Sequence, residues 1–286
     1  MANLKDIRER IRSVKSIQQV TKAMKMVAAA KMRRAQERME QARPYADRLS
    51  GVIESLLPEV DRQLLPLLEV REVKRMAVVV VTSDRGLAGS FNSNIIRRAE
   101  EVISAFGKQN VDLFCIGRKG HDYFRKRDYD ITEEHTDFWN DLSFGHAIRF
   151  GEGIVNHFTG GSVDKVTVVF NWFKNIATQE LRAEDLLPLI YDEGETKPVD
   201  RLYEPSKSEI VQSLVPRHVT IQVWRYLLES FASEQAARMV AMENATENAG
   251  ELIKDLTLEF NKARQASITK EMLEIVSGAE ALSMQG

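Results

Sequence analysis

The chain has 286 residues, of which 43% are hydrophobic and 29% charged, a composition typical of a foldable globular protein with room for two domains. Its formal net charge of -2 gives no general reason to expect nucleic acid or a membrane surface as a partner. No signal peptide is visible, and the longest purely apolar run, Met76 to Val81, is far below the roughly 20 residues of a spanning helix. We expect a reducing aqueous compartment and membrane association only through a partner.

The first segment, Met1 to Arg43, contains no glycine or proline and repeats an apolar side chain every three or four positions. This spacing predicts a long amphipathic helix. Its expected buried seam consists of Leu4, Ile7, Ile11, Val14, Ile17, Val20, Met24, Val27, Met32, Ala35 and Met39. Pro44 should kink the helix. Because apolar side chains continue at helical spacing as far as Leu57, the helix is expected to run on to Pro58, which gives an amino-terminal helical domain over residues 1–58.

The same helix has an uneven charge distribution. Between Arg10 and Gln36 there are eight basic residues and no acidic residue. A basic helix face can bind nucleic-acid phosphates through counterion release, or it can meet an acidic protein surface. It can also be no more than a solvated face beside an acidic helix. The pattern by itself leaves these three interpretations open.

The middle of the chain, residues 74–195, alternates strand patterns with helix patterns. Runs rich in β-branched residues predict strands over residues 76–82, 111–117 and 164–173, with a possible edge strand at 178–189. Helical patterns lie between them at 94–106, 119–127 and 141–159. Strands that alternate with helices predict a small α/β domain with a parallel sheet. The charged segment 192–208, with two prolines, is expected to be a linker.

The sequence contains no recognisable catalytic, nucleotide-binding or metal-binding motif. The turn from Ser83 to Asn92 follows a strand, as phosphate-binding loops do. Its Gly86 and Gly89 match neither GxGxxG nor GxxxxGK[ST], so we interpret it as a structural turn rather than a nucleotide site. The five histidines share no metal-ligand spacing with the single cysteine, Cys115. Cys115 lies in an apolar run and is interpreted as a buried thiol rather than a reactive one. We predict no catalytic, cofactor-binding or metal-binding residue.

The last segment is again helical, and residues 209–286 are predicted to form one long helix. Residues 217–286 contain no proline and would span about 105 Å as an unbroken helix. Two sets of seven-residue spacing predict a coiled coil, namely Met239, Thr246, Ile253 and Phe260, and Met242, Ala249, Leu256 and Ala263. After Ala263 the register slips, and a stripe that starts at Ile268 resumes out of phase. From Glu229 onward ten acidic residues face five basic ones, so this helix complements the basic first helix.

The two terminal helices are expected to pair with each other. If the first enters the α/β domain near Leu57 and the last leaves it near Ile210, they must be antiparallel. One-for-one pairing from that point places Met1 opposite about Ala266. About twenty carboxy-terminal residues would then protrude by roughly 30 Å as a single helix with an uncovered apolar stripe. We therefore expect this end to be inserted into a surrounding partner that covers the apolar stripe.

Four segments closely resemble the gamma subunits of bacterial F-type ATP synthases. They are SVKSIQQVTKAMKMVAAAKMRRAQ (13–36), SDRGLAGSFN (83–92), ASEQAARMVAMENATENAG (232–250) and ITKEMLEIVSGAEAL (268–282). The resemblance covers both ends and the middle in order. It implies a long antiparallel coiled coil of the terminal helices plus a central Rossmann-like α/β domain.

The resemblance also implies a function: a non-catalytic rotor shaft that couples proton-driven rotation of a c ring to ATP synthesis or hydrolysis. The implied partners are a hexamer of alpha and beta subunits, the epsilon subunit and the c ring, with no cofactor and no nucleic acid. The implied location is peripheral, on the cytoplasmic face of the bacterial cell membrane. The partner-contact residues that we carry over are Lys22, Met24, Lys25, Met26, Arg33, Arg34, Tyr203, Glu204, Arg264, Gln265, Thr269 and Glu271.

Two other classes of function remain open at this point. One is a coiled-coil scaffold or nucleic-acid-binding protein that uses the basic first helix. The other is a small nucleotide-using enzyme built on the middle domain.

Overall fold

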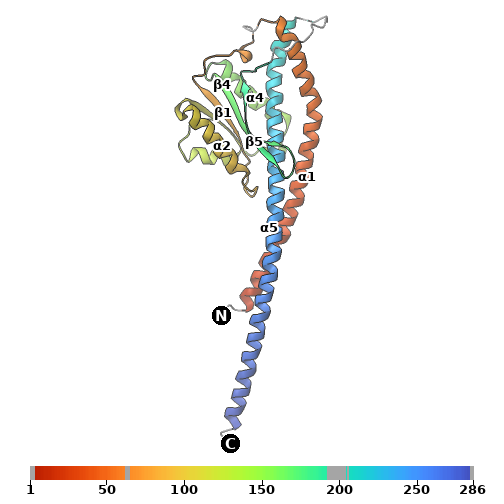
Figure 1. The fold of residues 1–286 in the computed structure, drawn as a ribbon, viewed down its shortest axis with the longest axis vertical. Helices are drawn as coiled ribbons and strands as arrows, with labels where there is room; N and C mark the ends of the chain where they lie inside the picture. Colours follow the sequence, from red (N-terminus) through yellow and green to blue (C-terminus); the bar gives the residue numbers. More distant parts are fainter. Residues whose placement is uncertain (1–3, 62–64, 192–203, 205, 284–286) are drawn as a thin grey trace. The chain divides into compact units, whose positions relative to one another are not determined.

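A computed structural model describes residues 4–61, 65–191, 204 and 206–283 of the chain. Two very long helices stand near the two ends of the sequence, and a five-stranded sheet with three shorter helices lies between them in sequence (Figure 1). The chain divides into two compact units, a larger one of residues 28–238 and a smaller one of residues 1–27 with 239–286. The expected terminal helices and central α/β fold are confirmed.

The sheet of the larger unit has the strand order β3-β2-β1-β4-β5. Its strands are β1 (Met76–Val81), β2 (Val111–Ile116), β3 (Ile131–His135), β4 (Lys165–Phe173) and β5 (Gln179–Leu187). β1 pairs in parallel with β2 and with β4, and β2 pairs in parallel with β3. β5 runs antiparallel to β4, so the sheet is mixed, with the predicted edge strand at that end.

Helices cover both faces of this sheet. Successive residues of a strand point to opposite faces, so β1 contributes side chains to two separate cores. Met76, Val78 and Val80 of β1 lie in a core with α2 (Phe91–Phe106) and α3 (Arg118–Arg125). The intervening β1 residues lie in a second core with α4 (Phe144–Thr159) and with parts of both long helices. The three predicted helices of the middle region are therefore confirmed. Short 3-10 turns complete the unit: η1 (Leu57–Glu59), η3 (Pro66–Leu68), η4 (Lys108–Asn110) and η5 (Trp139–Asp141).

The long helices are anchored in the larger unit by apolar burial. α1 (Leu4–Leu56) continues through Pro44, as predicted, and buries Ile53 and Leu56 in the second core. α5 (Lys207–Ser283) contributes Val219 and Leu227 to the same core. Fully burying a side chain of this size contributes about 1.5–3 kcal/mol. The roots of both helices are thus part of the α/β core.

In the smaller unit, α1 and α5 form an antiparallel pair. The hydroxyl of Thr21 lies 2.7 Å from that of Thr246, and the Arg8 guanidinium lies 5.4 Å from the ring centroid of Phe260. Lys25 forms an ion pair with Glu243. As the residue number rises along α1, the residue number of its partner on α5 falls, so the two helices are antiparallel. Counting one-for-one from Leu57 opposite Ile210 puts Thr21 opposite Thr246, so the predicted register is confirmed.

The α5 side of this seam follows the predicted seven-residue spacing. Met242, Ala249 and Leu256 are buried, and the alternating positions Thr246, Ile253 and Phe260 are half-buried. Thr246 is polar, but its hydroxyl donates to the Met242 carbonyl at 2.7 Å and contacts Thr21. A hydroxyl satisfied in this way can occupy a buried seam without a large desolvation cost.

The α1 side of the seam differs from the prediction. We expected Ile17, Val20 and Val27 to be buried, but their exposed fractions are 53%, 55% and 56%. Met24, which lies between Val20 and Val27 and was also expected in the seam, is half-buried. The residues that face α5 are instead Gln18, Thr21, Lys25 and Ala28, which continue a strict seven-residue repeat from Leu4 and Ile7. The prediction was wrong because it followed apolar residues, whereas the seam is polar here: Gln18 Nε2 donates to the Thr246 carbonyl at 3.3 Å and Lys25 pairs with Glu243.

Beyond the start of α1, α5 continues with its side chains in solvent. From Arg264 to Ser277 every residue is exposed except Ser267, and the exposed set includes Ile268, Met272 and Ile275. The helix itself continues to Ser283. The predicted uncovered carboxy-terminal helix is confirmed. Within the described residues, no helix is both long and apolar enough to cross a membrane.

Candidate partner-contact surface

One exposed apolar surface lies on α1 in the smaller unit. Ile17, Val20, Met24 and Val27 share one face of the helix, since they are spaced by three and four residues; we call them the α1 stripe. Three of the four are more than half exposed, because the strict heptad of the seam turns this face away from α5. A row of exposed large apolar side chains marks an interaction surface.

A basic face lies on another side of α1, because Lys22 is two residues from both Val20 and Met24 and so points away from the α1 stripe. Lys22 and Met26 are exposed and line a groove of about 500 Å³ together with residues of α5 that include Glu247. Among the described residues, Arg10, Arg12, Lys15 and Lys22 form no ion pair, whereas Lys25 pairs with Glu243. Positive charge on this part of α1 is therefore left largely uncompensated within the described residues. It suits an acidic surface, and the interaction would steer association more than it would add affinity.

The residues carried over from the family resemblance lie in three places. On α1, Lys22, Met26, Arg33 and Arg34 are exposed, and Met24 and Lys25 are half-buried. Near the start of α5, Glu204 is exposed, and Tyr203 lies outside the described residues, as does most of the predicted linker.

The third group is on the uncovered part of α5. Arg264, Gln265, Thr269 and Glu271 are all exposed. Their polar contacts are local to the helix: Thr269 Oγ1 donates to the Gln265 carbonyl at 3.0 Å, and Ser267 Oγ donates to Glu271 Oε1 at 3.2 Å. These side chains are free to contact a partner.

The sequence analysis assigned Ile17, Val20 and Val27 to the seam and therefore missed the α1 stripe. The seven-residue spacing from Leu4 through Ile11 to Gln18 is the signal that would have found it. The uncovered apolar stripe of α5 was expected, and Ile268, Met272, Ile275 and Val276 are exposed there. Leu273, which is also exposed, was not among the expected residues.

The turn between β1 and α2 is held by its own side chains and by one side chain of α5. Asp84 accepts the backbone N–H groups of Arg118 and Asp137, both at 2.9 Å. Arg238 Nη1 donates to the Gly86 carbonyl at 2.7 Å. Ser83 Oγ donates to the Arg85 carbonyl at 2.7 Å. These bonds support the interpretation of residues 83–92 as a structural turn that joins the sheet to α5.

The buried-thiol interpretation of Cys115 is confirmed. Its exposed fraction is zero, and burial raises the pKa of its thiol to about 12. A thiol with that pKa is almost entirely protonated at neutral pH and is therefore unreactive. Within the part of the chain that the structure describes, no three or more His, Cys, Asp or Glu side chains are arranged to hold a metal ion.

Two long antiparallel helices that share a core with an α/β sheet, and that carry exposed apolar and basic side chains, are typical of a shaft or scaffold subunit of a larger assembly. The sequence model of the family described as ATP synthase matches residues 3–282. The chain is 52% identical to the ATP synthase gamma chain of Prosthecochloris aestuarii and 51% identical to that of Chlorobaculum parvum, in each case over 99% of both chains. The chain belongs to the ATP synthase gamma chain family.

A solved structure gives the same assignment. The cryo-EM structure of the Tetrahymena thermophila mitochondrial ATP synthase, central stalk and c ring, contains a chain that is 28% identical to this one, with a TM-score of 0.63. The match covers 79% of this chain and 99% of that chain.

Proposed function

We propose that this chain is the central rotor shaft of an F-type ATP synthase, and that it couples rotation of a c ring to ATP synthesis or hydrolysis in a hexamer of alpha and beta subunits. The observation that carries the proposal is the pairing of α1 with α5 in the smaller unit, from which a single α5 end projects with exposed apolar side chains. Family membership fixes the class as a non-catalytic rotor subunit.

The uncovered end of α5 is proposed to lie in an apolar bearing formed by the hexamer. Exposed Ile268, Met272 and Ile275 are costly in water and gain when they are covered. Apolar contact is non-directional, so it allows the helix to turn without locking one angle. The polar residues of the same segment, Arg264, Gln265 and Thr269, are proposed contacts of the catalytic subunits.

The basic face of α1 is proposed to meet acidic loops of the beta subunits. Exposed ion pairs contribute only about 0–1 kcal/mol each, so they can be broken and remade at every step. The α1 stripe adds apolar contact on a different face of the same helix. A shaft whose faces differ in this way presents a different surface to each catalytic subunit in turn.

Rotation would change nucleotide affinity by population shift. Moving a two-state equilibrium from 1:99 to 99:1 requires a difference of about 5.5 kcal/mol in contact free energy between the states. Several weak ionic and apolar contacts can together supply that difference. The chain would therefore act on the chemistry of its partners without contributing a catalytic group.

The remaining parts of the proposal concern the α/β unit and the segment that precedes α5. The segment around Tyr203 and Glu204 is proposed to contact the c ring, and the α/β unit is proposed to bind the epsilon subunit. Membrane association would then go through the c ring, and the chain would be peripheral on the cytoplasmic face of the bacterial cell membrane.

Assembly with purified alpha and beta subunits tests the proposal. The tagged chain should bring down three alpha and three beta subunits per copy. Val20→Asp places an acid in the α1 stripe and should weaken this assembly at least about tenfold, because it buries an unpaired charge. Ser104→Asp introduces the same residue at an exposed position of α2, outside both proposed contact faces of α1, and should have little effect. No co-purification of the unmodified chain, or equal behaviour of the two variants, would contradict the proposed contact.

A further inference from the structure

The neighbouring strands β1 and β4 separate at their carboxyl ends. Their parallel pairing ends at Val80 opposite Val169. From there the chain leads from β1 to β2 on one side of the sheet and from β4 to β5 on the other. In open α/β sheets, ligands bind in the crevice at such a point, outside the carboxyl ends of the strands.

In this chain the helix α5 binds the two strand ends. Ser230 Oγ donates to the carbonyl of Val81, the last residue of β1, at 3.3 Å. Ser233 Oγ, three residues further along the helix, donates to the carbonyl of Asn171 on β4 at 3.2 Å. The two serines are 1% and 0% exposed, so both hydrogen bonds are shielded from water. The chain's own helix therefore lies where folds of this kind hold a ligand.

These two hydroxyl groups differ from others on the same helix. A serine or threonine inside a helix commonly donates back to a carbonyl of the preceding turn. Other hydroxyl residues of α5 do so at distances between 2.6 and 3.2 Å, namely Ser213, Thr220, Thr246, Thr257 and Thr269. Ser230 and Ser233 instead direct their donors out of the helix, so their hydrogen bonds tie α5 to the sheet.

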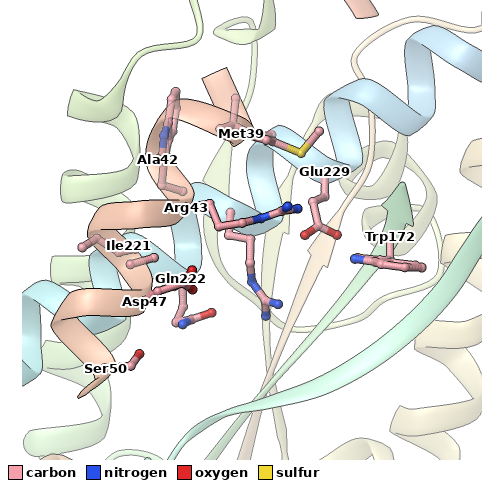
Figure 2. Close-up of a pocket in the computed structure, with 13 residues that line it drawn as sticks. Met39, Ala42, Arg43, Asp47, Ser50, Trp172, Ile221, Gln222 and Glu229 are labelled. Carbon is pink, nitrogen blue, oxygen red and sulfur yellow. The ribbon is translucent and has the colours of Figure 1, made fainter. Parts of the chain in front are cut away.

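The side of α5 that faces α1 borders a cavity of about 290 Å³ in the larger unit (Figure 2). Met39 and Ala42 of α1 line it, together with Ile221, Gln222 and Glu229 of α5. Side chains that border a void lack contact partners on that side, and apolar contact has no preferred direction. Packing against α1 alone therefore leaves the rotation of α5 about its own axis poorly fixed.

Two arginines of α5 flank the serine pair and also reach the α/β fold. Arg225 Nη2 donates to Glu184 Oε2 on β5 at 2.7 Å, and Arg238 Nη1 donates to the Gly86 carbonyl at 2.7 Å. An arginine side chain has many rotamers and can follow a small rotation of its helix. A serine hydroxyl is attached directly to Cβ, so its hydrogen bond restricts that rotation more tightly.

We propose that Ser230 and Ser233 are positioning residues that fix the rotation of α5 about its own axis in the larger unit, so that torque passes between the α/β unit and the shaft. α5 is one continuous helix from Lys207 to Ser283, so a rotation allowed at the two serines is a rotation of the shaft. The role in torque rests on the proposed rotor function, whereas the fixed rotation of α5 can be tested on the chain alone.

Distances between two spin labels on the full-length chain test the positioning role. Arg97→Cys on α2 and Ser213→Cys on α5 place the labels at exposed positions of the larger unit, and the buried Cys115 stays unlabelled. Because a helix with its side chains is about 10–12 Å across, a rotation of about 20° moves a label by about 2 Å. Replacing both serines by alanine should broaden the distance distribution by about that amount. Ser230→Ala or Ser233→Ala alone should broaden it less, and these single variants provide the test if circular dichroism shows the double variant to be unfolded.

A control variant separates positioning from general stability. Val219→Ala removes apolar burial from the same helix without removing a hydrogen bond, so it should leave the width of the distance distribution unchanged. In the assembled complex, with the hexamer fixed and a bead attached to α2, the double serine variant should widen the spread of bead angles within each pause, while the rate of ATP hydrolysis is unchanged. The proposal is overturned if the serine variants keep the unmodified distribution, if Val219→Ala broadens it equally, or if the spread of bead angles stays the same. A broadened distribution with a bead that never turns would support the fixed rotation of α5 and contradict the rotor function.

Discussion

Single residues decide how this fold responds to pH, and Glu229 is the clearest case. Its pKa is raised from 4.5 to about 7, chiefly by desolvation and in part by the charge of Glu184, while Arg225 and Arg182 act in the opposite direction. The native state therefore holds the proton more tightly than the unfolded chain does. The stability that this group contributes is complete below pH 4.5 and is lost as the pH rises through 7.

Glu229→Gln should remove this pH dependence. The free energy of unfolding of the variant, minus that of the unmodified chain, should rise by up to about 3 kcal/mol between pH 5 and pH 8. Urea unfolding at several pH values measures it. A constant difference across that range would show that Glu229 is ionised in the native state at pH 5.

The corrected seam of α1 gives a matched pair of substitutions. Ile7 is 3% exposed and lies in the pairing with α5, whereas Ile17 is 53% exposed and does not. Ile7→Ala should lower the free energy of unfolding by about 2 kcal/mol or more, and Ile17→Ala should change it by no more than about 0.5 kcal/mol. Thermal unfolding followed by circular dichroism separates the two. Equal losses at the two positions would instead fit the seam that was first predicted, which included both residues.

At the residue scale, apolar spacing was an incomplete guide. It placed Leu4, Ile7 and Ile11 in the seam correctly. Further along α1 it failed, because the seam positions there are occupied by polar residues. Thr21 and Lys25 can lie there because Thr246 and Glu243 meet them across the helix pair. Such pairing depends on residues more than 200 positions away in sequence, so no local pattern on α1 reveals it.

At the scale of elements, prediction succeeded where burial dominates the pattern. β1 and β2 are buried along their whole length; β1 is a continuous apolar run, and β2 is apolar except for Asp112. β3 was missed because its sequence, ITEEH, is charged and only alternately half-buried. α1 was predicted through Pro44 because its apolar spacing continues on both sides of the proline, and the structure agrees.

The uncovered end of α5 is the element most directly tied to function. Deleting residues 269–286 should leave the free energy of unfolding within about 0.5 kcal/mol of the full-length value, because the side chains described in this segment, at 269–277 and 279, are all exposed. It should nevertheless weaken assembly with alpha and beta subunits. Gel filtration of the reconstituted complex and thermal unfolding of the chain test the two halves.

A longer deletion provides the control. Removing residues 257–286 also removes Phe260, over which the Arg8 guanidinium lies, and should destabilise the helix pair itself. If the shorter deletion destabilised the isolated chain as much as the longer one, the α5 end would have a partner within the chain. If it left assembly unchanged, the proposed bearing contact would be wrong.

For the whole molecule, the function depends on motion relative to partners. The overall composition of the chain gives little indication of that function. The net charge of -2 hides an acid-free basic stretch on α1 and an excess of acids on α5. The family resemblance supplied the rotor function, while helix spacing supplied the antiparallel pairing and the uncovered end. Neither determined which faces of α1 are exposed, since that follows from the three-dimensional register.

Rotation itself is the decisive measurement. Cys115 is buried and its thiol pKa is raised to about 12, so a cysteine introduced at the exposed position Arg97 of α2 can be labelled selectively. With the alpha and beta hexamer fixed to a surface, a bead attached at Arg97→Cys should turn continuously in one direction when ATP is added. Steady ATP hydrolysis by the same complexes with a stationary bead would contradict the rotor function.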